Sequence, residues 1–237
     1  MNRLIHRADE RGFANHGWLK TFHSFSFSSY FDPNKMGFGA LRVLNDDTVE
    51  GGMGFGSHPH NNMEIISNPI EGALAPKDDH DNEKVIYNNE VQIMSAGTGI
   101  VHSEYNASKT EKVNFLQIWI LPKIKDIEPY YDQREFPIDN RKGKWQTLVS
   151  PGSEMNSLVI NQDAVIARVT LSKNDMIKYN AKFENSGFYL FVIEGDIKVK
   201  DIRLTRRDGL GVTKTNQISL NAFMESDILI IEVPILH

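Results

Sequence analysis

The stretch of sequence that decides the fold is GGMGFGSHPHNNMEII, from Gly51 to Ile66. It places two histidines, His58 and His60, one residue apart directly behind a glycine-rich run, in a chain that has only 8 histidines in 237 residues. On a β-strand, residues i and i+2 point to the same face of the sheet. Two imidazoles at this spacing can converge on one point, and the pattern therefore indicates half of a metal site.

A second stretch supplies the other half. In SAGTGIVHSEYN, His102 and Glu104 are again one residue apart and again follow a glycine turn. If the two strands lie opposite each other in a barrel, three imidazoles and one carboxylate meet. This donor set suits a divalent Fe, Mn, Ni, Cu or Zn ion. Four ligands leave one or two positions open on a five- or six-coordinate ion, as a reactive site requires.

The composition limits the classes of function. The chain is 40% hydrophobic and 24% charged, which is ordinary for a globular protein. Its formal net charge is −5, whereas proteins that bind nucleic-acid backbones usually carry a basic surface. We therefore predict no direct nucleic-acid partner. Because the chain has no cysteine, it cannot form a disulfide, a thiolate zinc site or a cysteine nucleophile. A metal must be held by nitrogen and oxygen.

No segment resembles a signal or a membrane span. The stretch MNRLIHRADERGF lacks the apolar core of a secretory signal, and no apolar run approaches the roughly 18 residues that cross a bilayer. We therefore expect a cytoplasmic protein with no membrane contact, and a monomer is the simplest state for a chain of this size.

Short apolar runs, broken by Gly, Asn, Asp and Pro about every 8–12 residues, predict an all-β sandwich or barrel. HSFSFSSYF, which begins at His23, alternates in polarity and reads as a strand with Phe25 and Phe27 on one face. The segment 122–144 holds three prolines and reads as a connection between two β units. Ile-Glu-Gly occurs at both 70–72 and 193–195, which favours an internal duplication.

The sequence resembles the pirin family, a group of bicupins. The resemblance is carried by these stretches: Gly17–Asp47, His58–Ile66, Met94–Ser108 and Phe115–Pro122. It implies two tandem cupin barrels of the double-stranded β-helix or jelly-roll type. The N-terminal domain, 1–125, would bind the metal. The C-terminal domain, 126–237, would have no metal site, because its one histidine is His237.

The resemblance also implies the ligands. In pirins the metal is bound by the residues that correspond here to His58, His60, His102 and Glu104. The spacing alone leaves Glu64 as a competing ligand, because the stretch also matches the first cupin motif, in which a glutamate follows His-x-His. By resemblance to pirins, Glu64 becomes a neighbour that orients an imidazole. The other histidines, among them His6, His16, His23 and His80, lack paired spacing and are predicted to be surface or core residues.

Pirins resemble quercetin 2,3-dioxygenases, which implies an iron-dependent dioxygenase that cleaves a flavonol such as quercetin. Glu104 is the predicted general base, with Glu64 as the alternative. The Ser/Phe-rich stretch HSFSFSSYF, together with Met53 and Phe55, is expected to line an apolar pocket for a small aromatic substrate. Trp18, Phe22, Phe25 and Phe27 are expected in the core rather than around a cofactor. The alternative function is a metal- or redox-sensing protein that acts through protein partners.

Overall fold

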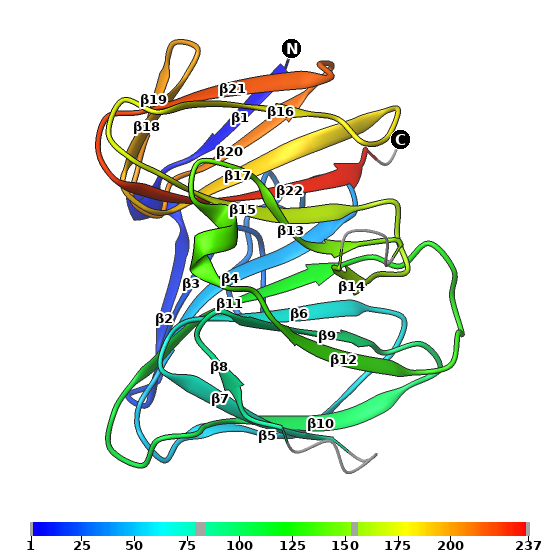
Figure 1. The fold of residues 1–237 in the computed structure, drawn as a ribbon. Coiled ribbons are helices and arrows are strands. Elements are labelled where there is room, and N and C mark those ends of the chain that lie inside the picture. The colour runs from blue at the N-terminus through cyan, green and yellow to red at the C-terminus, as the bar shows by residue number, and fades with distance from the viewer. Residues whose placement is uncertain (1, 79–83, 153–155, 236–237) are drawn as a thin grey trace.

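The computed structural model describes residues 2–78, 84–152 and 156–235. These residues form strands and two short 3-10 helices, η1 (Ala8–Glu10) and η2 (Ile138–Arg141). The strands build two barrels that lie one above the other (Figure 1), each from a seven-stranded and a four-stranded sheet. The prediction of an all-β chain with two tandem cupin barrels is confirmed. Among the described residues, no helix is long and apolar enough to cross a membrane.

The N-terminal barrel contains the predicted metal ligands. Its seven-stranded sheet has the order β12 (Tyr130–Glu135), β9 (Glu90–Ser95), β6 (Glu64–Glu71), β11 (Val113–Ile120), β4 (Leu41–Val49), β3 (Leu19–His23), β2 (Gly12–Asn15). Its four-stranded sheet has the order β5 (Gly54–His60), β10 (Ile100–Asn106), β7 (Ala73–Asp78), β8 (Ile86–Tyr87).

The C-terminal barrel repeats this arrangement. Its seven-stranded sheet has the order β1 (Asn2–His6), β20 (Gly209–Thr213), β17 (Ser186–Glu194), β22 (Ser226–Pro234), β15 (Val165–Leu171), β13 (Gln146–Ser150), β14 (Leu158–Val159). Its four-stranded sheet has the order β16 (Met176–Asn180), β21 (Gln217–Ala222), β18 (Asp196–Val199), β19 (Ile202–Thr205).

The strand orders of the two barrels correspond place by place. Strand β6 occupies the position of β17, and each ends in Ile-Glu-Gly. Gly72 and Gly195, which end these stretches, both have positive φ, 78° and 111°, a conformation that glycine adopts without steric cost. Two identical turns at equivalent places support the predicted duplication.

Each half of the chain contributes one edge strand to the barrel formed by the other half. Strand β1 pairs with β20 in the C-terminal barrel, whereas β12, which follows residue 125, pairs with β9 in the N-terminal barrel. β1 and β12 occupy equivalent edges. The chain therefore binds the two barrels together by exchanging edge strands.

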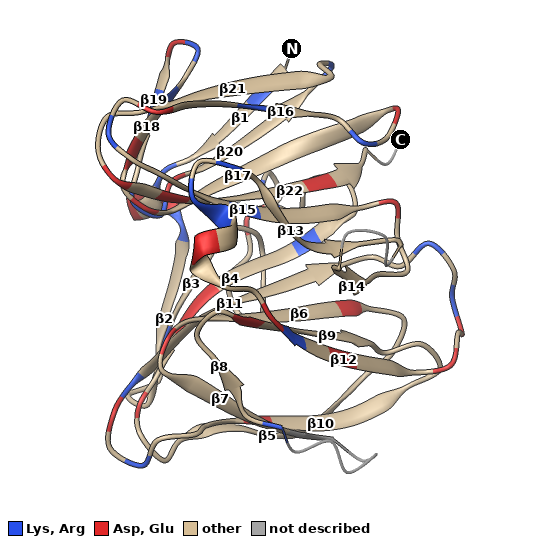
Figure 2. Ribbon diagram, viewed as in Figure 1, with Lys and Arg blue, Asp and Glu red and all other residues tan. Residues whose placement is uncertain are grey.

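The apolar residues form separate cores. One large cluster lies between the two seven-stranded sheets and includes Ile66 and Leu116 from one barrel and Leu229 and Ile231 from the other. A second cluster fills the C-terminal barrel. Among the described residues, the interior of the N-terminal barrel has two smaller clusters, with polar side chains between them. Charged residues of both signs lie mainly at turns and strand ends (Figure 2).

The predicted strand HSFSFSSYF is wrong. β3 ends at His23, and an isolated bridge between Phe27 and Tyr30 closes a tight turn in which Ser28 has a φ of 52°. Because the turn breaks the alternation, Phe25 and Phe27 do not share a face. Phe25 joins the cluster between the barrels, whereas Phe27 lines a cavity in the N-terminal barrel.

Candidate metal centre

Three of the predicted ligands come together. β5 and β10 are neighbours in one antiparallel ladder, and His58 lies directly opposite His102. The two strands therefore lie side by side, and the expectation that they face each other across the barrel is wrong. The ring centroids of His58 and His60 are each within 5.0 Å of that of His102. One ring nitrogen from each of the three histidines can be chosen so that all lie within 4.8 Å of one another.

The surroundings of the histidines fit a metal ion. His58 Nδ1 donates to the Gly56 carbonyl at 2.8 Å, which leaves Nε2 with the lone pair that binds a metal. His60 Nε2 is buried and has no hydrogen-bond partner among the described residues. Burial, together with the other two histidines, lowers the pKa of His60 to about 4. The imidazole is therefore neutral at pH 7, as metal binding requires.

Glu104 lies in the barrel beside this cluster but is not one of its three members. Its Oε1 accepts a hydrogen bond from Ser67 Oγ at 2.9 Å, and its Oε2 accepts one from Gln117 Nε2 at 2.8 Å. Ser67 and Gln117 belong to β6 and β11, so the carboxyl group reaches across to the seven-stranded sheet. Burial raises its pKa. The metal-binding role of Glu104 stays a prediction.

Glu64 faces away from the histidines. Along β6, Ile65 and Ser67 point into the N-terminal barrel, whereas Ile66 belongs to the cluster between the barrels. The alternation places Glu64 on the side of Ile66, where its Oε2 accepts hydrogen bonds from Ser95 Oγ and from the backbone N–H of Asn161, which belongs to the C-terminal barrel. The prediction that Glu64 orients an imidazole is therefore wrong. It connects the two barrels.

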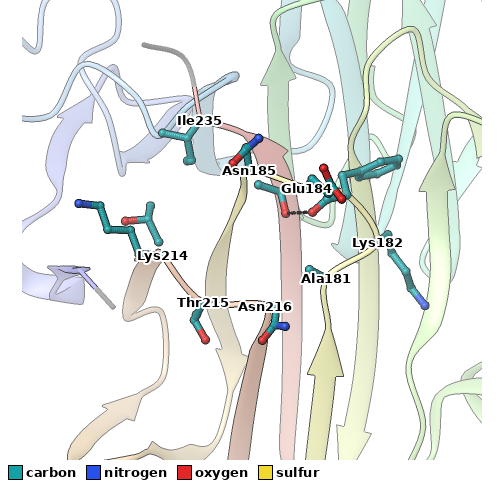
Figure 3. A pocket seen from close by; sticks show the side chains of 11 residues that line it. Ala181, Lys182, Glu184, Asn185, Lys214, Thr215, Asn216 and Ile235 are labelled. Carbon is teal, nitrogen blue, oxygen red and sulfur yellow. Dashed lines mark hydrogen bonds between the residues drawn. The ribbon is translucent and has the colours of Figure 1, made fainter.

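Two cavities adjoin the interior of the N-terminal barrel. One, of about 410 Å³, lies beside His60 and is lined by the segments 59–61 and 98–101. The other, of about 270 Å³, is lined by residues of β2, β3, β4 and β5, including the predicted Phe55. Met53 is exposed and does not line it. The cavity in Figure 3, about 850 Å³, belongs to the C-terminal barrel and has no histidine in its lining.

The remaining histidines do not join the cluster. His6 Nδ1 bonds the hydroxyl of Tyr189 at 2.8 Å, and His23 Nδ1 donates to Asn45 Oδ1 at 2.8 Å. His16 is exposed. His80 and His237 lie outside the described residues.

Sequence reasoning missed Ser67, Gln117 and Asp47, which are buried and point into the N-terminal barrel. The only signal for Gln117 is a single polar residue in the apolar run FLQIWIL, which has no motif to mark it.

Comparisons with known proteins agree over the whole chain. Residues 5–120 match the family model described as pirin, and residues 147–233 match the model of the quercetinase C-terminal cupin domain. A protein of Escherichia coli named quercetin 2,3-dioxygenase is 42% identical over 97% of this chain and 98% of its own length. A pirin-like protein of Caulobacter vibrioides is 40% identical over 94% of this chain and 96% of its own length.

A solved structure agrees as well. The crystal structure of a bacterial pirin from Escherichia coli in complex with nickel(II) has a TM-score of 0.94 and 40% identity, covering 99% of this chain and 100% of that one. The fold, the three-histidine cluster and the similarity along the whole chain all show that this chain belongs to the pirin family.

Proposed function

We propose that this protein is a metal-dependent dioxygenase that cleaves a flavonol such as quercetin. The observation that carries the proposal is the cluster of His58, His60 and His102, one member of which, His60, also lines a cavity of about 410 Å³. The names of the relatives support the same reaction, because the protein at 42% identity is called a quercetin 2,3-dioxygenase.

The metal would be held by His58, His60 and His102, with Glu104 as the proposed fourth ligand. When bound, a divalent ion of this kind acts as a Lewis acid that lowers the pKa of a coordinated hydroxyl group and activates it toward dioxygen. We propose iron as this ion. Nickel, which the Escherichia coli pirin binds, is the alternative. Turnover after reconstitution with each metal will distinguish between the two.

Glu104 is the proposed general base for the 3-hydroxyl of the flavonol. Ser67 and Gln117 each donate to one of its oxygens, so the carboxyl group is fixed in position before a substrate arrives. A carboxylate has about four lone-pair sites, and the two that remain would serve the metal ion and the substrate proton. Fixing the base in this way reduces the ordering needed when the substrate binds.

The test compares metal content with turnover. Elemental mass spectrometry should find near one equivalent of metal in the native protein and none in the His58→Ala variant. Oxygen uptake with quercetin should follow the metal content. Glu104→Gln should lose most of the turnover, and its metal content shows whether the carboxyl group is also a ligand. A metal-loaded protein that consumes no oxygen with any flavonol would refute the dioxygenase and favour the sensing role.

A further inference from the structure

The cavity of about 270 Å³ in the N-terminal barrel has aromatic walls. It lies between β2, β3, β4 and β5, and its lining includes Trp18, Phe27 and Phe55. Trp18 meets Phe55 edge to face, with ring centroids 5.3 Å apart and an interplanar angle of 73°. Trp18 and Phe27, which the sequence places in the core, are only partly buried. Walls of this kind suit a flat aromatic ring.

A polar group with a free acceptor lies among these walls. Asp47 is buried, lines the cavity, and its Oδ1 has no hydrogen-bond partner among the described residues. Its neighbour Asp46 points the other way, toward the C-terminal barrel, and forms ion pairs with Arg11 and Arg207. A buried acceptor without a donor destabilises the folded protein, and a donor from a ligand removes that cost.

The cavity adjoins the metal centre through two sets of contacts. Phe27 packs edge to face on Trp119 with centroids 5.3 Å apart, and Trp119 packs edge to face on His60 with centroids 4.9 Å apart. On the opposite wall, Phe55 is the ladder partner of Glu104. The ring of Trp119 thus lies between the cavity lining and His60, so the cavity is next to the histidine cluster.

We propose that this cavity is a subsite for the hydroxylated ring of an aromatic ligand, in which Asp47 Oδ1 accepts a hydrogen bond from a ring hydroxyl and Trp18, Phe27 and Phe55 enclose the ring. The subsite extends the proposed function, on which it rests for the identity of the ligand's reacting end. Asp47 would then discriminate between flavonols that share the 3-hydroxyl and differ in their other hydroxyl groups.

The charges around the cavity favour a neutral ligand. Burial, opposed by a hydrogen bond with Thr21 and aided by the nearby carboxyl groups of Asp46 and Glu104, raises the pKa of Asp47 to about 7. Burial disfavours charge in this cavity, and a phenolic hydroxyl donates a hydrogen bond without carrying a charge.

The experiment measures binding without turnover. Equilibrium dialysis under nitrogen is carried out on the metal-reconstituted protein with two probes, quercetin and 3-hydroxyflavone, the second of which has only the reacting hydroxyl. Asp47→Leu should weaken the binding of quercetin about tenfold and leave that of 3-hydroxyflavone unchanged. Asp47→Asn, which keeps the shape, should give a smaller loss. Asp139→Asn, at an exposed carboxyl group, is the control and should change neither.

Stability separates recognition from a structural role. The Oδ1 of Asp47 has no partner, and the side chain also has a hydrogen bond with Thr21. Relief of the unpartnered acceptor offsets loss of that bond, so Asp47→Leu should melt close to the native temperature. A lower melting temperature together with equal loss for both probes would overturn the proposal, as would unchanged quercetin binding. Oxygen uptake is measured separately. If the protein binds quercetin in preference to 3-hydroxyflavone through Asp47 but consumes no oxygen, the subsite is supported and the dioxygenase is refuted.

Discussion

The two barrels share one strand order but have opposite interiors. In the N-terminal barrel, the inward positions of the β5–β10 ladder include His58 and His102. In the C-terminal barrel, the corresponding β16–β21 ladder places Tyr179, Ile218 and Leu220 inside, each at most 3% exposed. The same fold therefore surrounds the histidine cluster in one barrel and a packed apolar core in the other.

The difference shows where the stability of the molecule comes from. The C-terminal barrel has one continuous apolar cluster, whereas the N-terminal barrel divides its apolar residues between two ends and keeps Glu104, Ser67 and Gln117 between them. Burial of apolar surface is the dominant favourable contribution to folding. The core between the barrels and the C-terminal barrel thus support the first barrel, whose interior can remain polar for function.

The largest effect is expected from His102→Ala. This variant removes one of three clustered nitrogen donors, and we expect metal affinity to fall by more than about a hundredfold, with turnover lost, because even removal of a residue that only supports a ligand costs 10–100-fold. Elemental mass spectrometry after dialysis measures the effect. His16→Ala, at an exposed histidine of the same barrel, is the control. Full metal content in His102→Ala would place the site elsewhere.

The next effect should appear in stability alone. Leu220→Ala removes a side chain 1% exposed from the core of the C-terminal barrel, and we expect the free energy of unfolding to fall by about 2–5 kcal/mol. Urea unfolding followed by circular dichroism measures it. Met176→Ala, at a position 74% exposed on the paired strand, should cost less than about 0.5 kcal/mol. Loss of metal in Leu220→Ala would show that the two interiors are not separable.

Within one strand, the sequence was enough to place the site. His58 and His60, and likewise His102, lie on one face because the period of a strand is two and no turn intervenes. The cupin-motif spacing did not place Glu64, because Asn62, with a φ of 47°, lies in the turn between β5 and β6 and breaks the alternation. Spacing across a turn does not determine the face on which a residue lies.

Long-range pairing was beyond the sequence for another reason. β1 is a five-residue strand, and nothing in NRLIH indicates that its partner β20 lies about 200 residues away. The lining by Trp18 was missed because hydrophobic residues in a core and in a pocket have the same composition. Only the position of Ser28 in a tight turn takes Phe27 out of the expected strand.

A smaller effect concerns the pH dependence of Asp47. Its pKa is about 7 in the folded protein against an ordinary value of 3.8, so the native state keeps a proton that the unfolded chain releases. The free energy of unfolding from this group therefore falls as the pH rises from 4 to 7. Asp47→Asn should gain roughly 1–3 kcal/mol relative to the native sequence over this interval. Urea unfolding of both proteins, with the metal chelated, checks this.

A constant difference between the two proteins from pH 4 to pH 7 would contradict the assignment. His6 and His60, whose pKa values burial lowers to about 4, contribute the opposite slope in both proteins. They cancel in the difference, which then reports Asp47 and its interaction with Asp46 and Glu104.

The smallest effect tests the buried glutamate of the C-terminal barrel. Glu232 accepts hydrogen bonds from Tyr179 Oη, from Ser186 Oγ, and from the backbone N–H groups of Lys182 and Phe183. It is fully buried and satisfied by several donors, which makes it a structural anchor, whereas Glu104 is held by two side chains beside a reactive cluster. Removal of one donor by Tyr179→Phe should lower the free energy of unfolding by only about 1 kcal/mol.

The remaining donors explain why this loss is small, since Glu232 keeps its backbone partners when the hydroxyl is gone. Tyr87→Phe, at a tyrosine 58% exposed, is the matched control and should change nothing in urea unfolding. Metal content and turnover should stay native in both variants, because Tyr179 lies in the barrel without the cluster. If Tyr179→Phe lowered turnover while the protein stayed folded, the anchor would act on the metal centre through the exchanged strands. The two interiors would then form one functional unit rather than a reactive barrel and its support.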